Sequence, residues 1–305
     1  MRLELGVNTC FAVKRWPSPA DWAPIVRNRL GLTLVEHSLD LVDLGAGVEA
    51  EAEAAAVVSA ASEFGLEVRS VFTGLAGYSS NLLLHPSASA RERAEGYFER
   101  AIAFSGRVGA TAIGGHVGAF SVGEWDDPYA RNERWAGLQA ALGRLATVAS
   151  RHGQDAIMVE NLAAAREPST MAMIRDILAD PAPDRAAVRL ALDVGHMCVP
   201  GTVGADRDPY AWLRQLGSAA HEIQLQQSDD AGDHHWPFTP AANERGRIDA
   251  DHVIDALGEA GVESIAMILE VIPPFEQEDG SVLDDMAASV DYWRDALARR
   301  GVAAS

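Results

Sequence analysis

The fold prediction starts from the stretch Val188-Arg-Leu-Ala-Leu-Asp-Val-Gly-His196. Its short apolar run indicates a buried strand that ends in Asp193, and His196 follows three residues later. A buried strand with polar side chains at its carboxyl end is typical of α/β enzymes, which gather metal or substrate ligands there. Further apolar runs in this chain end in the same way, at His116, Glu160, Gln226 and Glu270. One polar strand end means little, but a series of them in order indicates one shared rim.

The chain alternates between strand-like and helix-like patterns from end to end. The expected strands cover residues 3–9, 32–36, 66–73, 111–116, 156–160, 188–193, 222–226 and 265–270. The expected helices cover residues 19–30, 48–64, 88–108, 133–152, 168–178, 209–216, 249–260 and 281–299. This rhythm and the apolar strands predict an α/β fold, a (β/α)8 TIM barrel formed by one domain over residues 1–305. The alternative is a doubly wound sheet, which would need a glycine-rich phosphate turn after the first strand, and the sequence has none there.

The composition disfavours several kinds of partner. The net charge of −19 opposes binding to nucleic acid or to an anionic membrane surface. The beginning of the chain shows no export signal, and no run approaches the roughly 20 apolar residues that span a bilayer. Two cysteines, Cys10 and Cys198, cannot build a disulfide framework. These features predict a cytoplasmic enzyme. Lys14 is the single lysine, so a Schiff-base mechanism has only one candidate residue.

In a barrel, four side chains that can ligate a metal would converge at the carboxyl-terminal face: Glu160, Asp193, Gln226 and Glu270. Carboxylates that lie close together repel one another unless a cation neutralises them. Oxygen ligands favour a hard divalent cation, Mg²⁺ or Mn²⁺. If His196 or His235 also binds, the preference moves towards Mn²⁺, Co²⁺ or Zn²⁺.

Each candidate also has a structural alternative. Glu160 alone could cap a helix or join an ion pair, and Gln226 could satisfy carbonyl groups at the barrel mouth. Asp193 with His196 favours function, because a buried strand end is a poor place for an unpaired carboxylate. His116 lies among Gly114, Gly115 and Gly118, so substrate contact is favoured over packing.

Several motifs spread over nearly the whole chain belong together: Glu160-Asn161, Asp193-Val-Gly-His196, Gln226 with Asp229, Asp233-His-His235, Gly246-Arg-Ile-Asp249 and Glu270. In these motifs the chain resembles the sugar phosphate isomerases and epimerases of the xylose-isomerase-like, endonuclease IV-like TIM-barrel superfamily. The ketose 3-epimerases of that group hold a metal with Glu, Asp, His and Glu, which implies Glu160, Asp193 and Glu270 as ligands here. Most members have histidine at the position of Gln226. The hydroxypyruvate isomerase branch resembles this chain in having glutamine there.

The DNA-repair branch of the superfamily is disfavoured. That branch binds a zinc cluster with additional histidines, and Thr73 and Gln226 stand at strand ends where it needs ligands. The acidic composition agrees with this exclusion. The segments 200–210, 225–229 and 233–238 look most similar to the tetrulose-phosphate epimerases of erythritol catabolism, the D-erythrulose 1-phosphate 3-epimerase type.

This resemblance implies epimerisation of a small ketose or ketose phosphate by two-glutamate proton transfer through a cis-enediolate, with Glu160 and Glu270 as the catalytic pair. The predicted substrate contacts are His116, His196, Arg207, Asp233 and His235, with Arg207 as the first choice for a phosphate. Three alternatives remain open: an aldose–ketose isomerase like hydroxypyruvate isomerase, a metal-dependent dehydratase or hydrolase, and a non-catalytic sugar-binding barrel without metal. The expected partner is a small sugar or sugar phosphate, and a homo-oligomer is possible.

Overall fold

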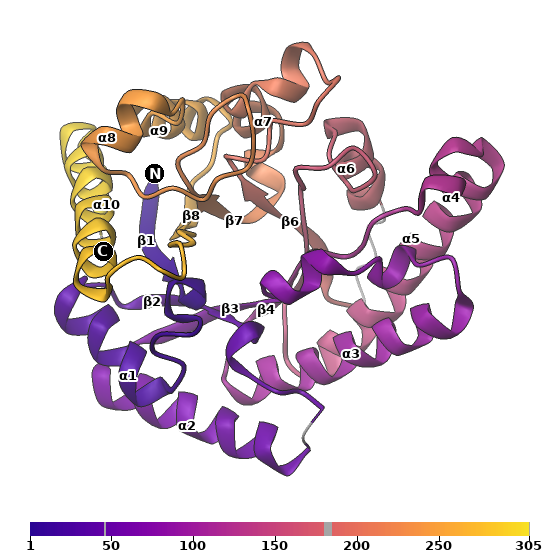
Figure 1. Ribbon diagram of the computed structural model, residues 1–305, viewed down its shortest axis with the longest axis horizontal. Helices are drawn as coiled ribbons and strands as arrows, with labels where there is room; N and C mark the ends of the chain where they lie inside the picture. The colour runs from indigo at the N-terminus through magenta and orange to yellow at the C-terminus, as the bar shows by residue number, and fades with distance from the viewer. Residues whose placement is uncertain (46, 180–184, 305) are drawn as a thin grey trace.

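A closed ring of parallel strands forms the centre of the protein (Figure 1). The computed structural model describes residues 1–45, 47–179 and 185–304. Neighbouring strands pair in sequence order, and the first strand pairs with both the second and the eighth, which closes the sheet. The strands are β1 Arg2–Asn8, β2 Leu34–Ser38, β3 Glu67–Phe72, β4 Ala112–Gly115, β5 Ala156–Glu160, β6 Ala187–Asp193, β7 Ala220–Leu225 and β8 Ser264–Leu269. A short strand, β9 (Ala303–Ala304), pairs with β1.

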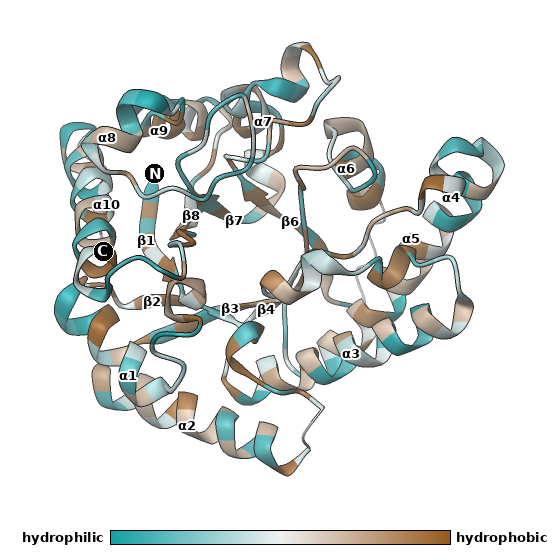
Figure 2. Cartoon of the chain, in the orientation of Figure 1, coloured by the Kyte–Doolittle hydropathy of each residue, from teal (hydrophilic) through white to brown (hydrophobic). Residues whose placement is uncertain are grey.

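Helices surround the strands on the outside (Figure 1). The longer ones are α2 Val48–Phe64, α3 Ala88–Arg107, α5 Pro128–Arg151, α6 Met171–Leu178, α7 Pro209–Leu216, α9 Ala250–Glu259 and α10 Asp279–Arg299. The shorter ones are α1 Pro19–Pro24, α4 Val122–Asp126 and α8 Pro240–Arg245. Figure 2 shows apolar and polar residues alternating around these helices, which is the pattern of helices with one buried side. None of the helices in the described ranges is both long and apolar enough to cross a membrane.

The barrel has two kinds of interior. A continuous apolar core includes Leu3, Leu5 and Val7 of β1 together with Trp22 and Trp293 from the surrounding helices. The alternate strand positions point to the inside of the ring, because successive side chains of a strand point to opposite faces. Small separate apolar clusters form there, Ala112, Ala156, Met158 and Ala191 in one and Leu34, Ala266 and Ile268 in the other. Fully buried polar side chains share this inner space: Asn8, Glu36, Ser70, Glu222 and Gln224.

The structure confirms the predicted α/β barrel and most of its elements. The helices at 48–64 and 209–216 have the predicted bounds. The helix predicted from 133 begins earlier, at Pro128, because the side chain of Asp127 accepts from the N–H groups of Tyr129 and Ala130 and caps it there. The short helices α4 and α8 were not predicted, since each is too brief to show a periodic pattern. The single domain over residues 1–305 stays a prediction, which one closed barrel supports.

Candidate metal centre and active site

The predicted metal ligands lie at the carboxyl ends of four consecutive strands. Glu160 and Asp193 are the last residues of β5 and β6, while Gln226 and Glu270 directly follow β7 and β8. All four side chains are fully buried. The closed ring therefore gathers residues that are more than 100 positions apart in the chain at one rim.

Three carboxylates form the centre of this rim. Glu160, Asp193 and Glu270 each offer an oxygen atom, and these atoms lie within 4.8 Å of one another. Burial, together with the charge of Asp193, raises the pKa of Glu160 to about 8. Burial and the neighbouring Glu160 raise the pKa of Glu270 well above its usual range. Because three buried carboxylates can stay ionised together only beside a cation, these residues fit a divalent metal.

Gln226 points its amide nitrogen, and not its oxygen, towards the acidic cluster. Its Oε1 accepts a hydrogen bond from the backbone N–H of His235 (2.7 Å), and its Nε2 donates to Asp193 (3.1 Å) and Asp233 (2.8 Å). A backbone N–H can only donate, so it fixes which end of the amide faces it. Gly195 makes room for this side chain, since a Cβ there would lie 2.4 Å from Cδ of Gln226. Ligation by Gln226 stays a prediction, and it would require the amide to turn away from His235.

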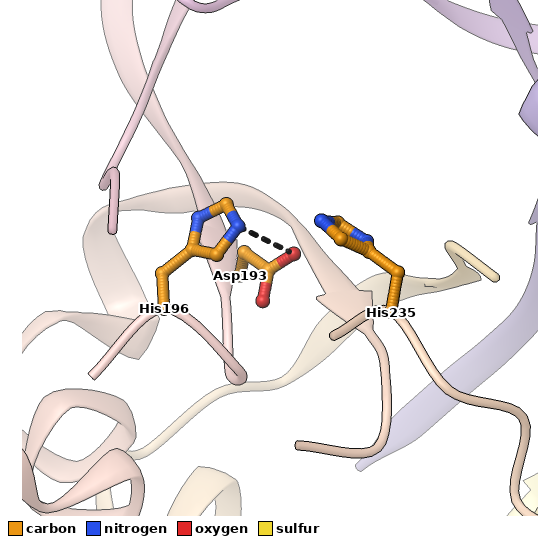
Figure 3. Close-up of side chains that lie close together, drawn as sticks. All are labelled: Asp193, His196 and His235. Carbon is orange, nitrogen blue, oxygen red and sulfur yellow. Dashed lines mark ion pairs between the residues drawn. The ribbon is translucent and has the colours of Figure 1, made fainter. Parts of the chain in front are cut away.

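Two histidines stand on either side of Asp193 (Figure 3). Nδ1 of His196 lies 2.7 Å from the carbonyl oxygen of Asn161, and Nδ1 of His235 lies 3.2 Å from the carbonyl oxygen of Glu270. A carbonyl oxygen only accepts, so each Nδ1 carries a hydrogen. Asp193, His196 and His235 form a second group that could hold a metal.

Asp233 joins the two imidazoles. Its carboxylate oxygens lie 3.3 Å from Nε2 of His196 and 3.2 Å from Nε2 of His235. Burial alone would lower the pKa of His196, but Asp193 and Asp233 raise it well above its usual range. The same contacts hold the pKa of Asp233 below its usual range, although burial opposes this. The structure thus brings three of the predicted substrate contacts, His196, Asp233 and His235, next to the carboxylates.

The backbone is strained at this point. His235 has a φ of 47°, in the left-handed region that side chains other than glycine rarely adopt. Such a conformation costs on the order of 1 kcal/mol or more and persists where surrounding contacts enforce it. Here the backbone bonds between Gln227 and Trp236 (2.9 and 3.0 Å) and the bond to Gln226 enforce it. In this conformation the ring of His235 lies next to Asp193 and Asp233.

His116 lies beside a residue that the sequence did not single out. Nε2 of His116 is 3.2 Å from the carbonyl oxygen of Ser80, and burial lowers the pKa of His116 to about 4, so its ring is neutral. The ring of Tyr78 stacks on it, with the ring centres 5.0 Å apart and the planes inclined by 18°. The hydroxyl of Tyr78 lies 2.7 Å from both carboxylate oxygens of Glu160. Tyr78 therefore belongs to the rim, and its only sequence signal was a tyrosine in the loop after a strand end.

Arg207 stands apart from the carboxylate cluster. Its guanidinium donates to the carbonyl oxygens of Val199 (3.3 Å) and Asp230 (3.0 Å). Arg247 reinforces the same segment, donating to the carbonyl oxygens of Met197 (2.9 Å) and Arg207 (3.0 Å). These bonds tie the loops after β6 and β7 together. The predicted phosphate contact at Arg207 stays a prediction, and it would compete with these loop contacts.

Fold and rim together define a TIM-barrel protein with a buried group of side chains that could hold a metal. The family model described as xylose isomerase-like TIM barrel matches residues 28–296. The chain belongs to this family, which confirms the resemblance seen in its motifs.

Individual relatives agree with this assignment. The chain is 26% identical over 300 residues to D-erythrulose 1-phosphate 3-epimerase from Brucella abortus, covering 96% of each chain. It is 31% identical to a crystal structure from Rhodospirillum rubrum that carries the provisional name xylose isomerase, with a TM-score of 0.89 and coverage of 96% of this chain and 99% of that one. A D-tagatose 3-epimerase-like protein shares the fold, with 13% identity, a TM-score of 0.75 and coverage of 99% and 98%. The curated relative is an isomerase, in agreement with the enzyme class predicted from the sequence.

Proposed function

We propose that this protein is a metal-dependent epimerase of a small ketose or ketose phosphate, with a tetrulose phosphate inverted at carbon 3 as the best candidate reaction. The observation that carries the proposal is the buried rim, where Glu160, Asp193 and Glu270 bring carboxylate oxygens within 4.8 Å of one another. The relative named D-erythrulose 1-phosphate 3-epimerase, aligned over 96% of the chain, supports the substrate class.

Glu160, Asp193 and Glu270 would hold the metal. A divalent cation bound there, Mn²⁺ or Mg²⁺, would polarise the ketose carbonyl and stabilise negative charge on the neighbouring oxygens. With Asp233 between them, the two histidines add nitrogen donors within reach, which keeps Co²⁺ and Zn²⁺ possible. Gln226 completes the rim as a hydrogen-bond donor in the present conformation.

Glu160 and Glu270 would carry the proton transfer. They stand at the ends of β5 and β8, so a sugar bound between them presents one face to each. One carboxylate removes the proton from the carbon beside the carbonyl, and the electron pair moves onto the carbonyl oxygen to give a cis-enediolate. The other carboxyl group returns a proton to the opposite face, which inverts the carbon.

The remaining rim residues would bind the substrate. His196 and His235 carry their hydrogens towards Asp193 and Asp233 when protonated, and can donate to sugar oxygens in place of those carboxylates. His116 is neutral and would orient a hydroxyl. The cytoplasmic location, the homo-oligomer and the phosphate contact at Arg207 stay predictions.

Deuterium incorporation tests the proposed reaction. D-Erythrulose 1-phosphate and a panel of ketoses with three to six carbons, free and phosphorylated, are incubated with the protein and Mn²⁺ in D₂O. We expect label at the carbon beside the carbonyl in the epimer that forms. Turnover without label would rule out proton transfer through solvent-exchangeable carboxyl groups.

An aldose–ketose isomerase is the second candidate, and Gln226 is the feature that favours it. The residue after β7 is glutamine here, as in the hydroxypyruvate isomerase branch that the motifs resemble. The same panel separates the two reactions, because an isomerase gives an aldehyde product and an epimerase gives a second ketose. Product analysis by NMR decides between them.

A further inference from the structure

We propose that Tyr78 is the positioning residue for Glu160: its hydroxyl orients the Glu160 carboxylate, so that one of the two catalytic glutamates is held more firmly than the other. This inference rests on the proposed function. Tyr78 acts through Glu160, and its role is distinct from the metal ligands and from the predicted substrate contacts.

The contacts of the Tyr78 hydroxyl are unusually specific. It lies 2.7 Å from Oε1 and 2.7 Å from Oε2 of Glu160. A tyrosine hydroxyl has one hydrogen, so it can donate to either carboxylate oxygen of Glu160 or to both in a shared bond. When a cation at the rim keeps Glu160 ionised, the hydrogen bond from Tyr78 is about twice as strong as one between neutral groups.

The opposite glutamate, Glu270, accepts a longer hydrogen bond. Asn8 reaches Oε1 of Glu270 only at 3.4 Å, and its amide makes a shorter bond of 2.8 Å to Glu36. Oε2 of Glu270 has no hydrogen-bond partner within the part of the chain that the structure describes. The two glutamates therefore differ in how firmly they are held. Glu160, at the end of β5, is fixed by Tyr78, and Glu270, after β8, is less constrained.

The loop that carries Tyr78 is anchored from a different strand. Both carboxylate oxygens of Asp40, which follows β2, accept backbone hydrogen bonds, from the N–H of Leu75 (2.6 Å) and of Ala76 (3.0 Å). Gly74, with a φ of 83°, turns the chain there, and a Cβ on it would lie 2.7 Å from the Asp40 carboxyl group. These contacts hold the backbone of the loop, and the stacking on His116 holds the Tyr78 ring itself. The hydroxyl is placed by the fold and not by chance rotation of a surface side chain.

An oriented carboxylate has a direct consequence for proton transfer. Glu160 must direct one oxygen to the substrate proton, and Tyr78 can bond the other oxygen at each stage. Removing the hydroxyl removes the hydrogen bond that orients the carboxylate, and we expect this to lower the rate of the chemical step more than it weakens substrate binding. The effect concerns mainly one face of the substrate, since the Tyr78 hydroxyl donates to Glu160 and, among the described residues, makes no hydrogen bond to Glu270.

The test is the Tyr78→Phe variant, with Tyr97→Phe as the matched control. Tyr97 also donates its hydroxyl near this loop, to the carbonyl oxygen of Thr73 (3.1 Å), but it contacts neither glutamate in the described structure. With Mn²⁺ and D-erythrulose 1-phosphate, we expect Tyr78→Phe to lower kcat by about 10- to 100-fold, the effect typical of residues behind metal-binding carboxylates, with KM within about threefold. Starting from each pure epimer in D₂O, the ratio of label in recovered substrate to label in product should change in Tyr78→Phe and not in Tyr97→Phe.

A second readout does not depend on turnover. The visible absorption spectrum of the Co²⁺-loaded protein reports the geometry of its carboxylate ligands, so Tyr78→Phe should shift it and Tyr97→Phe should not. The Asp40→Asn variant, which weakens the loop anchor, should shift it in the same direction by less. Equal spectra and equal kcat in wild type and Tyr78→Phe would overturn the inference. Absence of deuterium exchange in the wild type would overturn the proposed function, and the Co²⁺ spectra would then still decide the role of Tyr78.

Discussion

Two buried acidic clusters, one above the other in the same barrel, differ in how their charge is neutralised. At the rim, Glu160, Asp193 and Glu270 converge and two histidines lie next to them. Inside the ring, Glu36 accepts from Asn8 (2.8 Å) and Gln224 (3.3 Å), and Glu222 accepts from Ser70 (2.7 Å). The partners of the inner acids are neutral amides and a hydroxyl.

This difference shows what each cluster is built to hold. Neutral donors stabilise a carboxylate but cannot balance a second charge beside it, so the inner pair must bind a proton. Burial and then the charge of Glu222 raise the pKa of Glu36 well above its usual range, which agrees with this conclusion. The rim instead offers convergent oxygen atoms and ionisable imidazoles, as a cation or a reacting sugar requires. Burial of acids alone therefore does not identify a catalytic site.

The largest expected effect of a substitution is at the catalytic pair. Glu160→Gln and Glu270→Gln each remove a proton acceptor, and general acid–base groups contribute about 10²- to 10⁴-fold to rate. We expect each variant to lose epimerisation by a factor in this range. The measurement is epimer formation followed by NMR, with Glu36→Gln as the inner-cluster control.

The same variants separate epimerisation from hydrolysis or dehydration. A metal-activated water does not need two opposed glutamates, so a hydrolytic enzyme would keep more activity in one of the two variants than in the other. Equal loss in Glu160→Gln and Glu270→Gln, with activity retained in Glu36→Gln, supports the epimerase. A loss in Glu36→Gln as large as at the rim would remove the distinction between the clusters.

Metal affinity gives the next largest contrast. Asp193→Asn should weaken Mn²⁺ binding by about 100-fold, because it removes a charged oxygen from the rim and leaves the remaining acids less attractive to a cation. Glu222→Gln should leave Mn²⁺ affinity within about twofold, since its partner Ser70 lies in the inner cluster. Electron paramagnetic resonance of free Mn²⁺ measures both constants. Equal weakening would mean that the inner acids also bind the metal.

Much of the rim could be predicted because strand ends are visible in a sequence. Glu160 and Asp193 end apolar runs, and a closed parallel barrel must bring such ends to one face. Once the alternation of strands and helices was recognised, the convergence of these acids followed from topology alone.

Other parts of the site depend on contacts that a sequence pattern does not contain. Tyr78 reaches Glu160 because Asp40, from another strand end, fixes its loop. The amide of Gln226 is oriented by the backbone N–H of His235. His235 adopts a left-handed φ, which a sequence indicates only where glycine occupies the position. The pairing of Glu36 with Glu222 depends on register shifts in β2 and β6 that determine which side chains share a level inside the ring.

The smallest expected effects concern stability and pH, and they distinguish the two faces of one strand. Glu36 faces the inside of the ring, and the next residue, His37, packs in the outer layer between Trp22 and Phe104, with ring centres 5.7 Å away on each side. Burial lowers the pKa of His37 to about 4. Burial thus favours the neutral form of both Glu36 and His37. Glu36 becomes charged as the pH rises, and His37 becomes charged as the pH falls.

The signs follow from linkage. The pKa of Glu36 is raised in the folded state. Its contribution to the free energy of unfolding is therefore complete below about pH 4, the pKa of an unfolded glutamate, and is lost as the pH rises towards the folded pKa. The pKa of His37 is lowered, so its contribution is complete above about pH 6.5 and is lost as pH falls towards 4. Glu36→Gln should therefore be more stable than wild type at pH 9, by on the order of 1 kcal/mol. His37→Phe should reduce the loss of stability between pH 7 and pH 4.5 by a similar amount.

Urea unfolding of the metal-free protein at pH 4.5, 7 and 9 measures both effects. Metal is omitted because its binding at the rim would itself stabilise the folded state. Glu36→Gln should remove a loss of stability that grows from pH 4.5 to pH 9, and His37→Phe should remove a loss that grows from pH 7 to pH 4.5, because the two groups acquire charge in opposite directions of pH. If Glu36→Gln instead lowered stability at pH 9, the folded protein would favour the ionised form of Glu36. The contrast between a proton-holding interior and a cation-holding rim would then be wrong.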